Sequence, residues 1–235
     1  MNVIHAISVT DILCYEMVVL FTDGSIGNIQ ALYLLLSRSD IHVDGIVIDA
    51  GMCDIDDGIG NVLQLLTLME KYEIRVYRGS EWISFIPNNT DLELCSTLDI
   101  YTLQGEYEIN SHTELMNEYI GNAIALSPFS TVAEWIQNGS ITSLTAFIGS
   151  TSPNDLGYYI YAIDPQAYNY VLGSDIEKNM WSTDMMPQGL SNAVRSIVMS
   201  NSMLMNISKT VIPIIISGKW TFWDMITMMS YLKYI

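Results

Sequence analysis

The chain has 235 residues, a length that fits one α/β domain with a full hydrophobic core. Its 9 basic and 26 acidic residues give a net charge of −17, which argues against binding nucleic acid through its phosphates. Although 50% of the residues are hydrophobic, no run approaches the roughly 18 consecutive apolar residues of a membrane span. We therefore expect one domain over residues 1–235, with no membrane span and no nucleic-acid partner.

The low share of charged residues, 15%, leaves apolar surface that another subunit could cover. The composition therefore favours a protein partner or a homo-oligomer. The first ten residues lack the basic start of a secretory signal and the arginines of a transit peptide, so they indicate no compartment.

The first predicted unit is a buried strand that leads into a helix. Val18 to Phe21 is a short run of branched and aromatic residues, and Gly24 with Ser25 interrupts it. From Ile26 to Leu36 the apolar residues recur at helical spacing. Because α/β proteins place ligand-binding groups where parallel strands end, Asp23 in this turn is the first candidate site residue.

The rest of the chain continues the alternation of strands and helices, without a repeat or a long linker. Further strands are predicted at Ile41–Gly51, Ile74–Gly79, Leu144–Gly149 and Val211–Ile216, and helices at Asn61–Met69 and Trp220–Tyr234. Pro213 favours an edge position for the last of these strands. This order predicts a mostly parallel central sheet flanked by helices.

The turn after the first strand resembles the signature D-x-D-P-G-x-D-D of the nucleoside hydrolases, which are calcium-dependent N-ribohydrolases. The corresponding residues here are Phe21-Thr22-Asp23-Gly24-Ser25-Ile26-Gly27-Asn28. In that family the second acid and the last two bind calcium, and the penultimate acid also activates the attacking water. The resemblance implies that Asp23 and Asn28 keep two oxygen-bearing positions, whereas Phe21 and Gly27 replace two acids.

The resemblance extends along the chain and implies the family's fold with a shortened C-terminal part. The resembling segments are Ile41–Gly51 (V-A-G-N, with Met52 in place of asparagine), Ile74–Gly79 (V-Y-x-G), Leu126–Thr131 (L-G-P-L-T-N), Tyr161–Ala167 (Y-x-D-P-E-A) and Phe222–Met225 (H-D-P).

Several family positions carry residues without the family's chemistry. Asp224 matches the distal calcium-binding acid, and Leu126 could offer a backbone carbonyl to a metal, but Trp223 replaces the histidine that assists departure of the base. An asparagine that contacts ribose falls at Tyr159 or Ile160. Calcium takes about 6–8 oxygen ligands, so we expect a vestigial pocket of Asp23, Asn28, Leu126 and Asp224, with no catalytic residue and no cofactor, or Ca²⁺ if the site is retained.

Other candidates have structural explanations. Asp54, Asp56 and Asp57 could compensate for lost ligands or cap the helix near Gly58, and capping is favoured. The cysteines, which are Cys14, Cys53 and Cys95, are odd in number and widely spaced, so buried free thiols are expected. The histidines, which are His5, His42 and His112, are expected on the surface or in loops.

Two functions remain. The first is a catalytically degenerate, acidic nucleoside-hydrolase-like protein, kept as a structural or assembly subunit of a complex or homo-oligomer, in which nucleoside binding is doubtful. The second is a calcium-dependent N-ribohydrolase or ribosyl-binding protein with a rebuilt site. The substitutions at Phe21, Gly27, Met52 and Trp223 favour the first, so the sequence leans towards a protein that is not an enzyme.

Overall fold

The computed structural model describes residues 16–81, 95, 109–152, 158–185, 188–209 and 222–233. Its centre is a sheet of seven strands: β1 (Glu16–Thr22), β2 (Ile41–Ile48), β3 (Val76–Arg78), β4 (Asn110–Ser111), β5 (Gly121–Ala125), β6 (Ile141–Gly149) and β7 (Glu177–Ser182). Their order across the sheet is β4-β3-β2-β1-β5-β6-β7, and every neighbouring pair is parallel. The predicted parallel α/β fold is confirmed.

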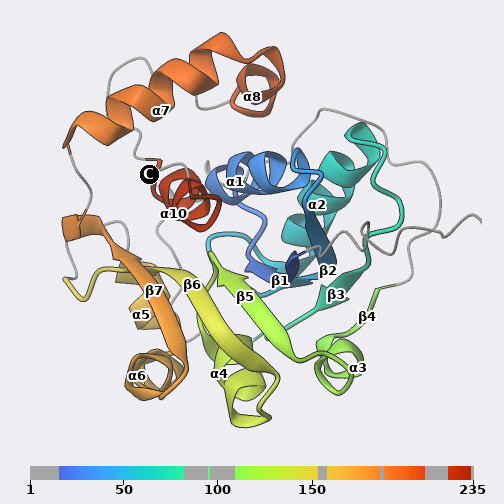
Figure 1. Ribbon diagram of the computed structural model, residues 1–235, viewed down its shortest axis with the longest axis vertical. Helices are drawn as coiled ribbons and strands as arrows, with labels where there is room; N and C mark the ends of the chain where they lie inside the picture. The colour runs from blue at the N-terminus through green and yellow to red at the C-terminus, as the bar shows by residue number, and fades with distance from the viewer. Residues whose placement is uncertain are drawn as a thin grey trace, which may run out of the picture.

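Helices cover both faces of this sheet (Figure 1). On one face lie α1 (Ile26–Leu36), α2 (Ile55–Leu68) and α10 (Trp223–Tyr231), with α7 (Gln188–Ser200) and α8 (Ser202–Ile207) outside them. On the other face lie α3 (His112–Met116), α4 (Ser130–Gln137), α5 (Tyr158–Ile163) and α6 (Pro165–Gly173), and the short 3₁₀ helix η2 (Thr183–Met185) follows β7. Within the described ranges, no helix is long and apolar enough to cross a bilayer.

Strand β1 lies at the middle of the sheet and carries the tightest part of the core. Val18, Val19, Leu20 and Phe21 are completely buried, because helices cover both faces. Phe21 packs edge-to-face on Trp135 of α4, with ring centroids 5.1 Å apart. Helix α1 contacts α10, which brings the N-terminal and C-terminal parts of the chain together at the carboxyl end of β1.

The predicted elements match the structure closely where the hydrophobic pattern is strong. Helix Ile26–Leu36 is observed with the predicted bounds, and the closing helix is shorter at both ends than predicted. The second helix begins at Ile55, earlier than predicted, because the Asp54 carboxylate accepts the Asp57 N–H at 2.9 Å and caps it. The strand predicted at 211–216 lies outside the described residues.

One histidine differs from the prediction. His112 is buried at the start of α3, where its Nδ1 accepts the indole N–H of Trp135 at 3.1 Å. Its Nε2 lies 3.5 Å from a carboxylate oxygen of Glu134. Burial lowers the pKa of His112, and Glu134 opposes that effect. His112 therefore belongs to the core between the sheet and α4 rather than to the surface.

The Phe21→Ala substitution tests this core. Because Phe21 is fully buried against Trp135, its loss should reduce the free energy of unfolding in urea by about 3–5 kcal/mol. The control is Tyr72→Ala, since Tyr72 is exposed and its change should stay within about 0.5 kcal/mol. A loss below about 1 kcal/mol for Phe21→Ala would contradict the packing described.

Candidate functional site

Asp23 lies at the carboxyl end of β1 and is held by backbone amides on two sides. Its side chain is fully buried; Oδ1 accepts the Ser25 N–H at 3.0 Å, and Oδ2 accepts the Met52 N–H at 2.9 Å. Gly24 adopts a φ of +69°, the left-handed conformation that glycine adopts readily, and so turns the chain from β1 into α1. A Cβ on Gly51 would come within 2.6 Å of Asp23 Oδ2, so the loop after β2 approaches the carboxylate closely.

Asn28, in the first turn of α1, faces back towards the end of β1. Its Oδ1 accepts the Thr22 hydroxyl at 2.6 Å and the Asp23 N–H at 3.3 Å. Because a backbone N–H only donates, the oxygen must lie on this side and the amino group on the other. Asn28 Nδ2 is buried and has no hydrogen-bond partner among the described residues.

Asp224, in the first turn of α10, brings a second acid to the same place. Its Oδ1 is inaccessible to solvent and, within the described part of the chain, has no hydrogen-bond partner. Its Oδ2 occupies the space in which a Cβ on Gly27 would lie. A carboxylate from α10, a helix far away in the sequence, therefore fills the space that a side chain at residue 27 would occupy.

These groups act on one another electrostatically. Burial raises the pKa of Asp224 to about 8, the charge of Asp23 adds to the shift, and the Asn28 side chain opposes it. Burial likewise raises the pKa of Asp23. Burial also raises the pKa of Tyr159 well above its usual value, with further contributions from both acids. Tyr159, one of the two predicted ribose-contact positions, therefore lies close enough to both acids for their charges to act on it.

The remaining positions predicted for the pocket pack into or against the core, with Phe21 completely buried and Trp223 partly buried. The Phe21 ring packs against α4, on the face of the sheet away from α10, and Trp223 stacks on Phe147 of β6 with centroids 5.3 Å apart. The Phe21 ring is therefore directed away from the two acids. Leu126 and Met52 are buried, and the backbone N–H of Leu126 donates to the Phe21 carbonyl at 2.9 Å.

A third buried acid was missed by sequence reasoning. Asp49 follows β2 and is 1% exposed. Its Oδ1 accepts the Ser80 N–H at 2.9 Å and the Thr131 hydroxyl, and its Oδ2 accepts the Ser127 hydroxyl at 3.1 Å. Burial raises the pKa of Asp49 to about 7, the three donors oppose the shift, and Asp23 adds to it. The signal in the sequence is an acid in an apolar strand run, immediately before Ala50-Gly51.

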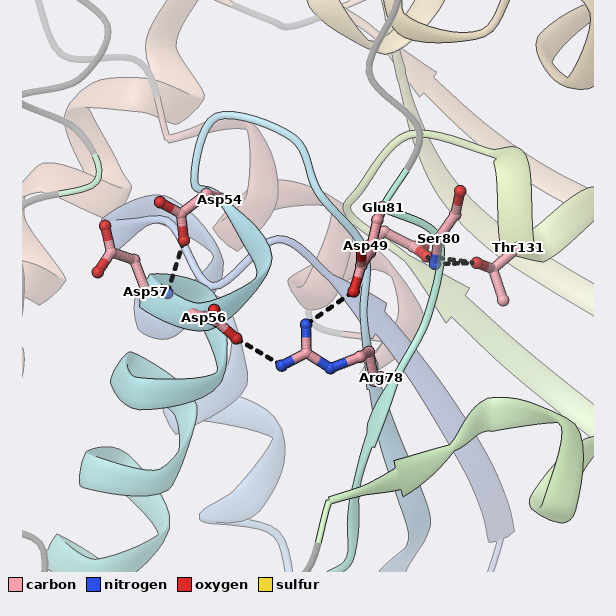
Figure 2. A network of polar contacts seen from close by, with 8 residues as sticks. All are labelled: Asp49, Asp54, Asp56, Asp57, Arg78, Ser80, Glu81 and Thr131. Atoms are coloured by element: carbon pink, nitrogen blue, oxygen red, sulfur yellow. Dashed lines mark hydrogen bonds and ion pairs between the residues drawn. The ribbon is translucent and has the colours of Figure 1, made fainter.

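The acidic cluster after β2 has structural roles (Figure 2). Asp54 caps α2, and Asp56 accepts a hydrogen bond from the guanidinium of Arg78 at 2.5 Å, while Glu81 accepts another at 3.0 Å. These pairs lie near the surface, so each contributes little to stability. The capping interpretation of the sequence agrees with these contacts.

The expectation of free thiols is wrong for two of the cysteines. Cys53 and Cys95 form a disulfide with Cα atoms 5.0 Å apart. Cys53 directly follows Met52, so this bond fixes the loop whose amide holds Asp23. The odd number of cysteines hid the pair, and Cys14 lies outside the described residues.

Comparison with solved structures identifies the fold. An inosine-uridine preferring nucleoside hydrolase from Bacillus anthracis superposes with a TM-score of 0.73 at 16% identity, over 93% of this chain and 82% of the other. A purine-preferring ribonucleoside hydrolase from Gardnerella vaginalis gives 0.70 at 14%, over 93% and 80%. This chain has a nucleoside-hydrolase-like fold.

A plant nucleoside hydrolase gives a TM-score of 0.72 at 14% identity, over 93% of this chain and 79% of the other. The similarity is therefore one of fold, and this chain spans about four fifths of the length of these enzymes. No known family model and no curated protein matches the sequence.

The Gly27→Ala substitution tests whether Asp224 fills the space beside the Gly27 Cα atom. An alanine inside a helix normally stabilises it by about 0.5–1 kcal/mol over glycine. Here the new methyl group would meet Asp224 Oδ2, so the Asp224 side chain must shift, and we expect a loss of up to about 1 kcal/mol instead, measured by urea unfolding.

The matched control is Gly60→Ala in α2, where no atom lies within 4 Å of the added carbon and the normal gain is expected. In an Asp224→Ala background, Gly27→Ala should again increase the free energy of unfolding. Equal losses in both backgrounds would show that Asp224 does not fill this space.

The Asp49→Asn substitution tests the buried acid through pH. Its folded pKa, raised from 3.8 to about 7, means that its contribution to stability is fully present below pH 4 and is lost as pH rises through 7. The uncharged variant lacks this loss. Its free energy of unfolding relative to that of the wild type should therefore rise between pH 4 and 8, by an amount on the order of a few kcal/mol. Parallel pH profiles of urea stability for the two proteins would contradict the raised pKa.

Proposed function

We propose that this protein is a catalytically inactive nucleoside-hydrolase-like protein that serves as a structural or assembly subunit of a larger complex or a homo-oligomer. The observation that carries the proposal is at Gly27. The resemblance places the water-activating acid at this position, and here the space of that side chain is filled by Asp224. A second substitution supports it, because Trp223 stacks on Phe147 where the family has a histidine.

The loss of both groups matters because N-glycoside cleavage needs an activated water and help for the departing base. General acid and base groups each contribute about 100-fold or more to rate. Glycine has no side chain, and an indole does not titrate. The Asp224 side chain is only partly exposed and its Oδ1 is inaccessible to solvent, so it is a poor substitute for a base that must reach a water.

The role in assembly is supported by apolar side chains on the surface. Met17 and Ile120, 51% and 72% exposed, lie at the amino ends of the neighbouring strands β1 and β5. We call these two residues the amino-edge patch. On the outer helix α7, Ile197 and Met199 are also exposed. A partner that covers the amino-edge patch would remove its apolar side chains from water.

The catalytic part of the proposal is tested by incubating the purified protein with inosine and with uridine, with and without calcium. We expect no release of base above an uncatalysed control, and the same result for Asp23→Ala. Calcium-dependent turnover that disappears in Asp23→Ala would overturn the proposal. It would establish the second candidate, a calcium-dependent N-ribohydrolase or ribosyl-binding protein, which the convergence of Asp23, Asn28 and Asp224 favours.

The assembly part is tested by light scattering after size-exclusion chromatography across a concentration series, and by cross-linking in its native extract. We expect a species larger than the 26.4 kDa chain. The Ile120→Lys variant should weaken that species, whereas Tyr72→Lys, at an exposed aromatic elsewhere, should not. A monomer at all concentrations without any cross-linked partner would contradict an assembly role.

A further inference from the structure

The side-chain amide of Asn28 has only one orientation that fits its surroundings. The Asp23 N–H and the Thr22 hydroxyl both reach the same atom of this side chain, at 3.3 and 2.6 Å. A backbone N–H requires an acceptor, so that atom is Oδ1. The Thr22 hydroxyl is itself held in place, because it accepts the Gly24 N–H at 3.1 Å. The two lone pairs of Asn28 Oδ1 are therefore both in use.

This orientation matters because the resemblance makes residue 28 a calcium ligand. A cation needs an oxygen from this side chain, but the amide presents its NH₂ group to the side of Asp224 instead. The Asn28 side chain lies near enough to Asp224 to lower its pKa, although no hydrogen bond of normal length joins the two. An NH₂ group carries partial positive charge and has no lone pair to give to a metal.

The Asp23 carboxylate is also engaged. Each of its two oxygens accepts a backbone N–H, from Ser25 and from Met52. Calcium takes about 6–8 oxygen ligands with several carboxylates among them. Among the described residues, no group of three or more histidine, cysteine, aspartate or glutamate side chains is placed to hold a metal. The residues present therefore do not fit the ion that the fold family implies.

Two inaccessible polar atoms at this site still need partners. Asn28 Nδ2 is a donor and Asp224 Oδ1 is an acceptor, and neither is paired within the described residues. An unpaired buried polar group costs about 1–3 kcal/mol. A cation could satisfy only the acceptor and an anion only the donor, whereas a hydroxyl group can accept from one and donate to the other.

We infer that Asn28 Nδ2 and Asp224 Oδ1 form a metal-free hydrogen-bonding site that takes a neutral hydroxyl group, either an ordered water or the hydroxyl of a sugar. Asn28 replaces the cation as the positively polarised group that faces Asp224. This inference concerns the chemistry of the pocket and is independent of the proposed role in assembly.

Calorimetric titration of the wild-type protein with calcium chloride alone tests the inference without any variant. We expect no saturable heat, and no rise in the melting temperature at about 10 mM calcium. Saturable binding that disappears in Asp23→Asn would overturn the inference. Because the nucleoside assay has its own readout, a protein that binds calcium but turns over no nucleoside would overturn this inference alone.

The Asn28→Asp variant tests the reason for the exclusion. A carboxylate keeps an acceptor for Thr22 and Asp23 and turns a second oxygen towards Asp224, so calcium should now bind. For a millimolar dissociation constant, about 10 mM calcium should raise the melting temperature by roughly 3–6 °C.

The control is Gln30→Glu, the same amide-to-acid change on α1, at a side chain that faces Ser208 instead. It should show no calcium-dependent shift. A folded Asn28→Asp protein that still ignores calcium would overturn the assignment of the Asn28 amide as the group that excludes the metal.

Ribose, titrated without calcium, distinguishes the two sources of the hydroxyl. Saturable binding that is lost in Asn28→Ala would identify a sugar hydroxyl. An absence of binding, together with no response to calcium, would leave an ordered water as the occupant. Ribose binding that requires calcium would overturn the inference.

Discussion

The burial of carboxylates at the carboxyl edge of the sheet is the constraint on which the rest of this site depends. A carboxylate removed from water must be protonated or must be given hydrogen-bond donors. Asp23 receives two backbone N–H groups, from the turn before α1 and from the loop after β2. Asp49 receives three donors, from the ends of β3 and β5 and from α4. The two acids thereby join most of the strand ends to one another.

The third acid is partly exposed and is held differently. Asp224 has no comparable set of donors among the described residues, and its Oδ2 lies in the space left by Gly27. Asp224, at the start of α10, can thus take this position only because residue 27, at the start of α1, is a glycine. The contact between α1 and α10 holds it in place. Fold similarity to nucleoside hydrolases sets where these residues lie, but their chemistry has to be derived from the contacts themselves.

Much of the fold could be predicted from the sequence, because hydrophobic periodicity determines it. The helix Ile26–Leu36 and the strand before it follow directly from apolar spacing. The pairing of Asp23 with Asp224 could be predicted only through the family resemblance, since about 200 residues separate them. The Asn28 orientation could not be predicted, because it depends on which neighbours donate to it. The Cys53–Cys95 bond was missed because spacing between distant cysteines carries no geometric information.

A high-resolution crystal structure of the wild-type protein grown in calcium would test the central claim most directly, since the claim concerns where a few oxygen and nitrogen atoms lie. The account predicts Asp224 Oδ2 packed against Gly27, Asn28 Oδ1 accepting from Thr22 and Asp23, and no ion in the pocket. A calcium ion coordinated together by Asp23, Asn28 Oδ1 and Asp224 would contradict it.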